Sequence, residues 1–349
     1  MSVRKLLTAG IAGLVLAATA ACSSSADADD AAPSSSASGG VATVEAPDTL
    51  RIAYQLIPNG DLVVKNQKLL EKAFGDNVQI EWKQFDSGGK VNEAVLSKSV
   101  DIGLAGSSPV SRGLSTGVEY QVPWIFDVIG TAEALAAKPG IATVADLKGK
   151  TIATPFASTA HYSLLAALEE AGIAQKDVKI IDSEPDAILA AWKAGQIDAA
   201  YVWNPVLAEL TKDGGTILTD SAKLAATGKT TYDLAVVTTD FATKYPEAVQ
   251  TWLNAQNEAV GQLKAGDAKA YESIAAELSI PVDEVKKQTA GLQFVDAAEQ
   301  AGATYLGGGL ATNLFAAAEF NKALGEIPSV SSQQAYTDAV LTTFAQNAK

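Results

Sequence analysis

Strand-like and helix-like segments alternate along this chain from residue 49 onward, and this alternation is what most limits the folds open to it. Residues 49–54 and 78–85 have the short, β-prone pattern of strands, and residues 64–74 between them have helical spacing. A helix-like segment over 90–97 and a strand-like segment over 100–105 repeat the unit. Such a series favours an α/β lobe in which parallel strands are joined by crossover helices.

A second series of the same kind begins after Glu133. Its members are strands over 150–153, 178–181 and 199–203 and helices over 159–171 and 186–194. The chain then returns through 233–238, and from Phe241 onward the pattern is nearly all helical, with prolines at 246, 281 and 328 marking starts or breaks. We expect this tail to pack on the first lobe. The sequence therefore predicts two α/β lobes, residues 47–134 plus 236–349 and residues 135–235, with a ligand cleft at the hinge between them.

The first 22 residues have the form of an export signal. Arg4 and Lys5 precede an uncharged stretch that is too short to span a bilayer, which needs about 20 apolar residues. Small residues then lead to Cys22, at the position where bacterial lipoprotein signals carry the cysteine that receives a lipid. We expect cleavage and lipidation at Cys22, followed by a flexible tether over 23–46 that is poor in large apolar side chains. The protein is then anchored in the cell envelope, at the outer face of the cytoplasmic membrane or in the periplasm.

Composition argues against several classes of function. The chain has 26 basic and 40 acidic residues, a balance that disfavours nucleic acid as a partner. Cys22 is the single cysteine, so no disulfide can form within the chain. His161 is the single histidine and lacks the partners of a histidine metal site or a catalytic triad. Phosphate-loop and dinucleotide fingerprints are also absent from the sequence, so we expect no cofactor, no metal and no enzymatic activity.

Two turns at matching places in the two lobes carry the candidate binding groups. Each has a strand end, small hydroxyl residues and a helix start, at 104–109 and at 154–161. Each helix start attracts an anion by about 0.3 to 2 kcal/mol through its free N–H groups and positive helix end, and hydroxyl groups add donors without adding charge. The alternative is that these residues are ordinary helix caps. The candidates from these turns, from a third turn over 85–90 and from the end of the first strand are Ser107, Ser108, Ser158, Thr159, Ser87 and Gln55.

Aromatic and acidic residues add a second kind of candidate. Trp203 ends a strand-like segment, where its indole face can form a wall for a ligand or bind an ammonium group. Asp233, where the chain returns to the first lobe, is the first choice as the carboxylate for such an ammonium, and Asp127 and Glu133 are the reserves. His161 lies one turn into a helix of the second lobe, where it can point at a bound anion or be structural.

Four segments together resemble the periplasmic taurine-binding proteins of ABC importers. They are FDSG at 85–88, GSSP at 106–109, PFASTAHYSLLAAL at 155–168 and AAWKAGQIDAAYVW at 190–203. The likeness runs from about residue 49 into the C-terminal region, and Ser-Thr-x-His-Tyr at 158–162 is its most specific part. The resemblance implies a type II periplasmic solute-binding fold, with a sulfonate held by the hydroxyl turns and a taurine ammonium held by acidic and aromatic groups.

The predicted function is that of a monomeric substrate-binding lipoprotein of an ABC importer, which captures taurine or a related aminoalkyl sulfonate by cleft closure and delivers it to a membrane permease. One stretch, WIFDVIGTAE at 124–133, departs from the family pattern and brings a bulky aromatic residue and an acid near the hinge. It leaves other small anions or zwitterions open as ligands, such as an alkanesulfonate, nitrate or a substituted amine. A protein of the related thiamine-precursor type is the remaining alternative.

Overall fold

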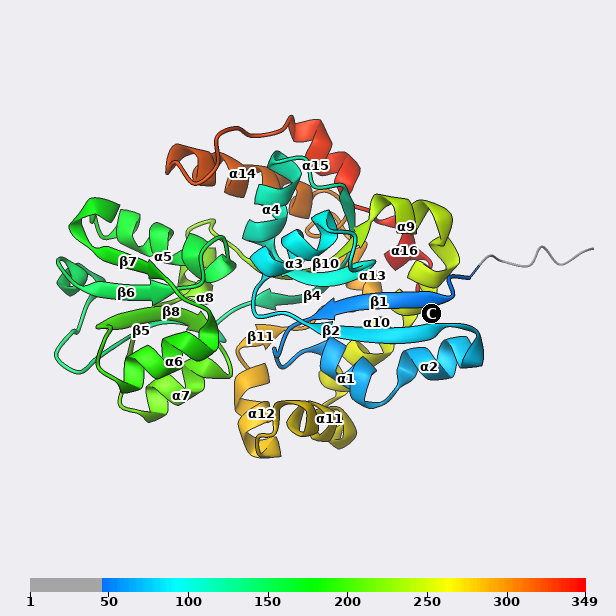
Figure 1. Ribbon diagram of the computed structural model, residues 1–349, viewed down its shortest axis with the longest axis horizontal. Coiled ribbons are helices and arrows are strands. Elements are labelled where there is room, and N and C mark those ends of the chain that lie inside the picture. Colours follow the sequence, from blue (N-terminus) through cyan, green and yellow to red (C-terminus); the bar gives the residue numbers. More distant parts are fainter. Residues whose placement is uncertain (1–45) are drawn as a thin grey trace, which may run out of the picture. The chain divides into compact units, whose positions relative to one another are not determined.

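The computed structural model describes residues 46–349, whose strands form two sheets (Figure 1). The predicted signal, Cys22 and all but the last residue of the predicted tether lie outside the described residues. No helix in the described part of the chain is long and apolar enough to cross a membrane.

The first sheet has six strands in the order β11-β4-β10-β3-β1-β2. The strands are β1 (Thr49–Tyr54), β2 (Gln79–Gln84), β3 (Ile102–Gly106), β4 (Tyr120–Ile129), β10 (Tyr232–Thr238) and β11 (Leu292–Gln293). β1 pairs in parallel with β2 and β3, as predicted, whereas β10 runs antiparallel to both β3 and β4. The strands joined by crossover helices are therefore parallel, as expected, and β10 is antiparallel because it enters the sheet from the second lobe.

The second sheet has five strands in the order β7-β6-β8-β5-β9. They are β5 (Glu133–Ala137), β6 (Thr151–Thr154), β7 (Lys179–Asp182), β8 (Ala199–Trp203) and β9 (Thr216–Asp220). β6 is parallel to β7 and β8, and β5 is antiparallel to β8 and β9. We call each sheet with the helices that cover it the first and the second lobe. The boundaries expected from the sequence fall inside β5 and β10, so the chain crosses between the lobes a few residues earlier, over 130–132 and 227–231.

Helices cover both sheets and form most of the C-terminal third. The helices of the first lobe before the crossing are α1 (Gly60–Asn66), α2 (Leu69–Phe74), α3 (Gly88–Leu96) and α4 (Ser107–Ser115). Those of the second lobe are α5 (Thr159–Glu170), α6 (Pro185–Lys193), α7 (Val206–Lys212) and α8 (Ser221–Ala226). The remaining ones are α9 (Thr239–Lys244), α10 (Pro246–Ala265), α11 (Ala268–Leu278), α12 (Val282–Thr289), α13 (Ala297–Gln300), α14 (Gly309–Ala323), α15 (Gln333–Ala339) and α16 (Thr343–Gln346). Short 3-10 turns lie at Gly75–Asn77, Val144–Leu147 and Gln175–Asp177.

The single helix predicted over 64–74 is two helices, α1 and α2. Lys68 separates them with a left-handed backbone (φ 54°), a conformation that breaks the helical hydrogen-bond ladder and that periodicity does not reveal. Pro246 begins α10 and Pro281 directly precedes α12, as expected for prolines that mark helix starts.

The C-terminal helices pack on the first lobe, which confirms the expectation for the tail. Trp252 and Leu253 of α10 and Leu310 of α14 belong to the same buried cluster as Leu50 and Ile52 of β1. α14 also reaches the second lobe, because Phe320 packs edge to face on Tyr162 of α5 with 5.0 Å between the ring centres. The second lobe has its own core beneath α5 and a further one beneath α6 and α7.

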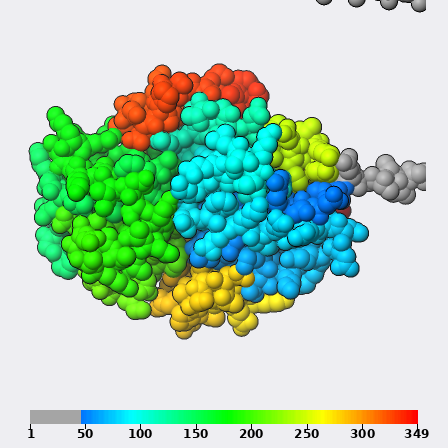
Figure 2. Space-filling view, in the orientation of Figure 1, coloured from blue at the N-terminus to red at the C-terminus, as the bar shows by residue number. Residues whose placement is uncertain are grey.

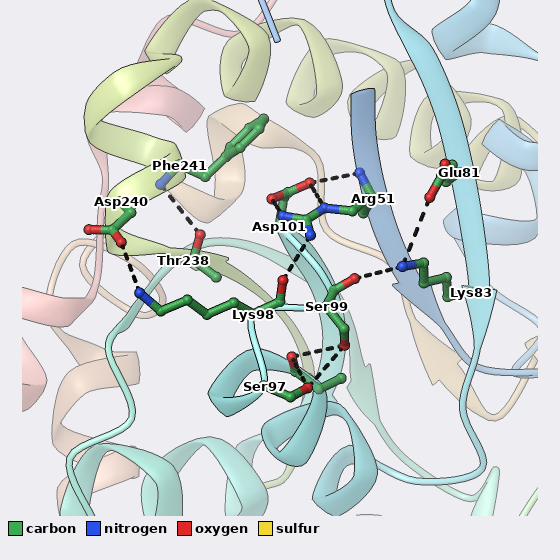
Figure 3. A network of polar contacts seen from close by, with 11 residues as sticks. Arg51, Glu81, Lys83, Ser97, Lys98, Ser99, Asp101, Thr238, Asp240 and Phe241 are labelled. Atoms are coloured by element: carbon green, nitrogen blue, oxygen red, sulfur yellow. Dashed lines mark hydrogen bonds and ion pairs between the residues drawn. The ribbon is translucent and has the colours of Figure 1, made fainter. Parts of the chain in front are cut away.

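A network of ion pairs and hydrogen bonds joins residues of the first sheet and its adjoining segments (Figure 3). Arg51 of β1 binds Asp101 through Nε and Nη2, and the backbone carbonyl of Asp101 accepts from Thr238 N at 2.9 Å. Lys98 Nζ lies 3.9 Å from a carboxylate oxygen of Asp240, in the first turn of α9. Asp101 and Thr238 thus lie at the opposite ends of β3 and β10 from Gly106 and Asp233, which pair across these two strands.

Candidate ligand-binding site

A narrow pocket lies where the strands of the first sheet end against the second lobe. It is lined by fifteen residues: Gln55, Ile57, Pro58, Gly88, Gly106, Pro109, Ile129, Ala132, Glu133, Ser158, Thr159, Trp203, Asn204, Asp233 and Leu292. Both lobes contribute, and no lysine or arginine is among these residues. Figure 2 shows the two lobes in contact on the face in view, cyan against green. The pocket therefore admits only a small ligand unless the lobes move apart.

Three helices begin at this pocket. Gly88 is the first residue of α3, Gly106 precedes α4, and Ser158 precedes α5. The lobes meet closely here, since a Cβ placed on Gly106 would lie 2.6 Å from Thr159 Cγ2. The first N–H groups of each helix have no partner within the helix and carry partial positive charge. The pocket can therefore bind an anion through backbone N–H groups without a basic side chain.

The hydroxyl groups of the second-lobe turn already have acceptors. Ser158 Oγ accepts from His161 N at 3.1 Å and lies 2.6 Å from the carbonyl oxygen of Pro155, to which it donates. Thr159 Oγ1 donates to Glu133 Oε2 at 2.5 Å. From the sequence these hydroxyls were expected to donate to an anion, but here their protons are used within the protein. The first backbone N–H groups of α5, which have no partner within the helix, are the donors that this wall offers to an anion.

Glu133 is the acid of the second-lobe wall. It begins β5, is 1% exposed, and accepts hydrogen bonds from Thr159, Ser163 and Ser221 at 2.5, 3.4 and 2.7 Å. Burial raises the pKa of Glu133 to about 7, although the three hydroxyl donors oppose that rise. This carboxyl was only a reserve candidate from sequence, and the structure places it in the pocket lining.

Asp233 is the acid of the first-lobe wall. It lies on β10, directly opposite Asp127 on β4 and Gly106 on β3. Asp233 lines the pocket and is 6% exposed, whereas Asp127 is fully buried behind it and is not part of the lining. Burial, together with the negative charge of Glu133, raises the pKa of Asp233 to about 7.

Trp203 and Gln55 complete the predicted residues that line the pocket. Trp203 ends β8, is half-buried, and pairs across the sheet with Glu133. Gln55 follows β1, and its amide nitrogen donates to the carbonyl oxygen of Leu104 at 3.0 Å. Five of the ten predicted ligand residues thus lie together in the lining: Gln55, Ser158, Thr159, Trp203 and Asp233.

The other five lie near the pocket without lining it. Ser107 Oγ accepts from Tyr232 N at 3.2 Å, and Ser108 Oγ accepts from Asn321 at 3.4 Å. Ser87 donates to Glu184 of the second lobe at 3.2 Å, and so joins the lobes instead of facing the pocket. Asp127, as described, lies behind Asp233. All five are buried.

His161 has a structural environment. Its ring stacks on Phe156 with 4.5 Å between ring centres, and Nδ1 lies 3.8 Å from a carboxylate oxygen of Glu326. Burial lowers the pKa of His161, although the charge of Glu326 opposes this. These contacts support a structural role for His161 and not a contact with a bound anion.

Several lining residues were not found from sequence. Gly88 and Gly106 contribute backbone, and Leu292 comes from β11, far along the chain in a region whose pattern reads as helical. Asn204 follows Trp203 directly, so its position beside a predicted site residue was the one available signal.

The chain is similar to known proteins over most of its length. Residues 75–270 match the model of the family described as NMT1/THI5 like. The taurine-binding periplasmic protein of Escherichia coli is 36% identical over 301 residues, which cover 84% of this chain and 92% of that protein. A putative aliphatic sulfonates-binding protein of the same organism is 32% identical over 191 residues, or 54% of this chain and 60% of that protein.

Solved structures agree on the fold. The alkanesulfonate-binding protein SsuA of Xanthomonas axonopodis, bound to MOPS, is 27% identical and has a TM-score of 0.69, with 86% of this chain and 98% of that chain covered. The desulfurization enzyme DSZB has a TM-score of 0.62 at 16% identity, with 86% of this chain and 99% of that chain covered. At that identity the likeness to DSZB shows a shared fold alone.

Proposed function

The chain belongs to the NMT1/THI5-like family, and from that premise we propose that it is the substrate-binding component of an ABC importer that captures taurine or a closely related aminoalkyl sulfonate. The taurine-binding protein of Escherichia coli, similar to this chain over nearly its whole length, supports the choice of ligand. Binding is reversible and makes or breaks no covalent bond.

The observation that carries the proposal is the two-sided chemistry of the pocket. The starts of α3, α4 and α5 provide backbone N–H groups for an anion, and Asp233 provides a carboxylate for a cation a short distance away. A sulfonate stays ionised at any ordinary pH, so neutral N–H donors suit it and a basic side chain is not needed. A zwitterion with a sulfonate at one end and an ammonium at the other matches both features.

In this scheme the helix starts hold the sulfonate, Asp233 pairs with the ammonium, and Trp203 covers the short carbon chain. Desolvation by the closing lobes strengthens each of these interactions. Ser87 and Glu184 join the lobes beside the pocket and stabilise the closed form. The closed form then presents both lobes to the permease. The segments over 130–132 and 227–231, which connect the lobes, absorb the hinge motion.

Titration calorimetry with three ligands tests the proposal. Taurine carries both a sulfonate and an ammonium group. Ethanesulfonate carries the sulfonate alone, and propylamine carries the ammonium alone. We expect tight binding of taurine, weaker binding of ethanesulfonate and no measurable binding of propylamine. Equal affinity for taurine and ethanesulfonate would reject the ammonium pairing, and a failure of every sulfonate to bind would reject the family function for this chain.

An unsubstituted alkanesulfonate is the second candidate ligand. The three helix starts serve any sulfonate, and the raised pKa of Asp233 leaves this carboxyl partly neutral near pH 7, so that an uncharged ligand tail is tolerated beside it. The alkanesulfonate-binding protein of Xanthomonas axonopodis, similar at 27% identity, is in keeping with this reading. Tighter binding of ethanesulfonate than of taurine is the result that would favour it.

The place of action is the cell envelope, where we propose that Cys22 carries the lipid anchor. The export signal and the cysteine at its end support this assignment, and a monomer delivering its ligand to a membrane permease is the form expected to work there. Metabolic labelling with a radioactive fatty acid should mark the wild type and not Cys22→Ser. Equal labelling of the two would reject the anchor.

A further inference from the structure

Two acids, Asp127 and Asp233, form a buried pair in the first-lobe wall of the pocket. They lie directly opposite each other on the antiparallel strands β4 and β10. Opposed residues of such strands have their Cβ atoms about 4.5–5.5 Å apart, on the same face of the sheet. Asp127 is 0% exposed and Asp233 is 6% exposed, and only Asp233 reaches the pocket.

The surroundings of Asp127 are neutral or acidic. Neither of its carboxylate oxygens accepts a hydrogen bond from a donor among the described residues. The groups that act on it are Asp233 from β10, Glu133 from β5 and the amide of Asn59 before α1, and none of these is basic. The other packed elements bring uncharged residues, Leu292 and Gln293 of β11 and Trp252 of α10.

Two carboxyls in such a setting cannot both ionise, because each charge would be desolvated and would repel the other. Burial and the charge of Asp233 raise the pKa of Asp127 well above its ordinary value. Asp233 titrates nearer neutral pH and borders the pocket. Asp127 is therefore the member of the pair that keeps its proton.

We propose that Asp127 is a positioning residue that stays neutral and donates a hydrogen bond to the carboxylate of Asp233, so that the pair presents one negative charge to a bound ammonium. The inference rests on the proposed function, since Asp233 is the ligand contact and Asp127 acts through it. As the pH falls through about 7, Asp233 also takes up a proton, so the ligand-free pair becomes neutral. An ammonium ligand then displaces one proton, which passes from Asp233 to solvent.

Two substitutions of Asp127 by side chains of nearly equal size test whether this residue acts as a neutral hydrogen-bond donor or as a negative charge. Asp127→Asn keeps the shape and an N–H donor, whereas Asp127→Leu removes the donor. We expect Asp127→Asn to bind taurine within about threefold of the wild type at pH 7.5, with the same pH midpoint of affinity. Asp127→Leu should raise that midpoint by about one pH unit, because the buried Asp233 carboxylate loses its donor. Equal weakening by both substitutions would overturn the proposal, since the charge of Asp127 would then be required.

Proton counting on the wild-type protein gives a measurement that does not depend on how the variants fold. Taurine binding is followed by calorimetry at pH 6 in two buffers of different ionisation enthalpy. Release of about one proton per taurine is expected from a pair in which only Asp233 ionises. Release of two protons, or of none, would overturn the assignment. Absence of taurine binding from pH 5 to pH 9 would instead reject the proposed ligand, which is a separate outcome.

Discussion

The two walls of the pocket each carry one buried carboxyl, and these carboxyls differ in the donors around them. Glu133, in the second-lobe wall, accepts hydrogen bonds from three hydroxyl groups. Asp233, in the first-lobe wall, faces another acid and receives no hydroxyl hydrogen bond from the described residues. Burial raises the pKa of both side chains to about 7. The two carboxyls thus have similar pKa values but different roles. The oxygens of Glu133 accept hydrogen bonds from within the protein, whereas those of Asp233 are available to a ligand.

Replacing Asp233 is the strongest test of this difference. Asp233→Asn should weaken taurine binding by about 2 to 5 kcal/mol, because it leaves a buried ammonium without its carboxylate. Ethanesulfonate, which has no ammonium, should bind the variant at least as well as it binds the wild type. Calorimetry with both ligands measures the two effects.

Asp240→Asn is the matched control for Asp233→Asn. It removes the same charge from the far end of the first-lobe sheet, where the Asp240 side chain is 89% exposed (Figure 3). It should leave both affinities unchanged. If Asp233→Asn instead reduced the free energy of taurine binding by less than about 0.5 kcal/mol, the loss would be no more than an exposed ion pair contributes. That result would mean that Asp233 does not pair with the ligand.

The contact between the walls gives a second, smaller effect. Gly106 has an ordinary extended backbone (φ −65°, ψ 160°), so alanine is strained there only by its Cβ, which would lie 2.6 Å from Thr159 Cγ2. Gly106→Ala should therefore hold the lobes apart and weaken taurine binding by about 1 to 3 kcal/mol, the usual range for overpacking. Calorimetry measures the loss, and the unfolding temperature reports whether the first lobe itself is affected.

A second substitution on the opposite wall should restore binding. Thr159→Ser removes the Cγ2 atom and keeps the hydroxyl that donates to Glu133. The double variant Gly106→Ala, Thr159→Ser should bind taurine much more tightly than Gly106→Ala alone. Gly89→Ala serves as the control, since its new Cβ would have no neighbour closer than 3.8 Å. Failure of the double variant to recover would show that the lobes do not close through this contact.

Much of the fold could be predicted from the sequence because strand and helix periodicity is local. β1 lies at the residues expected, 49–54, and the start of α5 follows from the Ser158 cap. The site was only half predictable. Helix starts at 107 and 159 were visible as turns, but the orientation of Ser107 and Ser108 is set by Tyr232 and Asn321, more than 100 residues away.

The pairing of Asp127 with Asp233 could not be predicted for the same reason. The two residues are brought together by the antiparallel strands β4 and β10, which lie on either side of the whole second lobe in the chain. Each acid alone is an ordinary candidate for a ligand contact. The assignment of one as contact and the other as support depends on which of them reaches the pocket surface, and that is a property of tertiary packing.

Glu133→Gln gives the smallest expected effect and tests the other half of the comparison. An acid whose folded pKa lies above its unfolded value of about 4.5 binds more protons when folded, so its contribution to stability is present at low pH and is lost as pH rises from about 4.5 to 7. At pH 5 Glu133 is neutral. There Glu133→Gln should destabilise the fold by about 1 kcal/mol, because an NH2 group replaces one of the two oxygens that accept hydrogen bonds from hydroxyl groups. At pH 8 the difference should shrink or reverse, since Gln does not carry the buried charge.

Urea unfolding of Glu133→Gln and the wild type at both pH values measures this difference in stability, and taurine affinity should change less than in Asp233→Asn. A large loss of affinity at unchanged stability would show that Glu133, like Asp233, contacts the ligand.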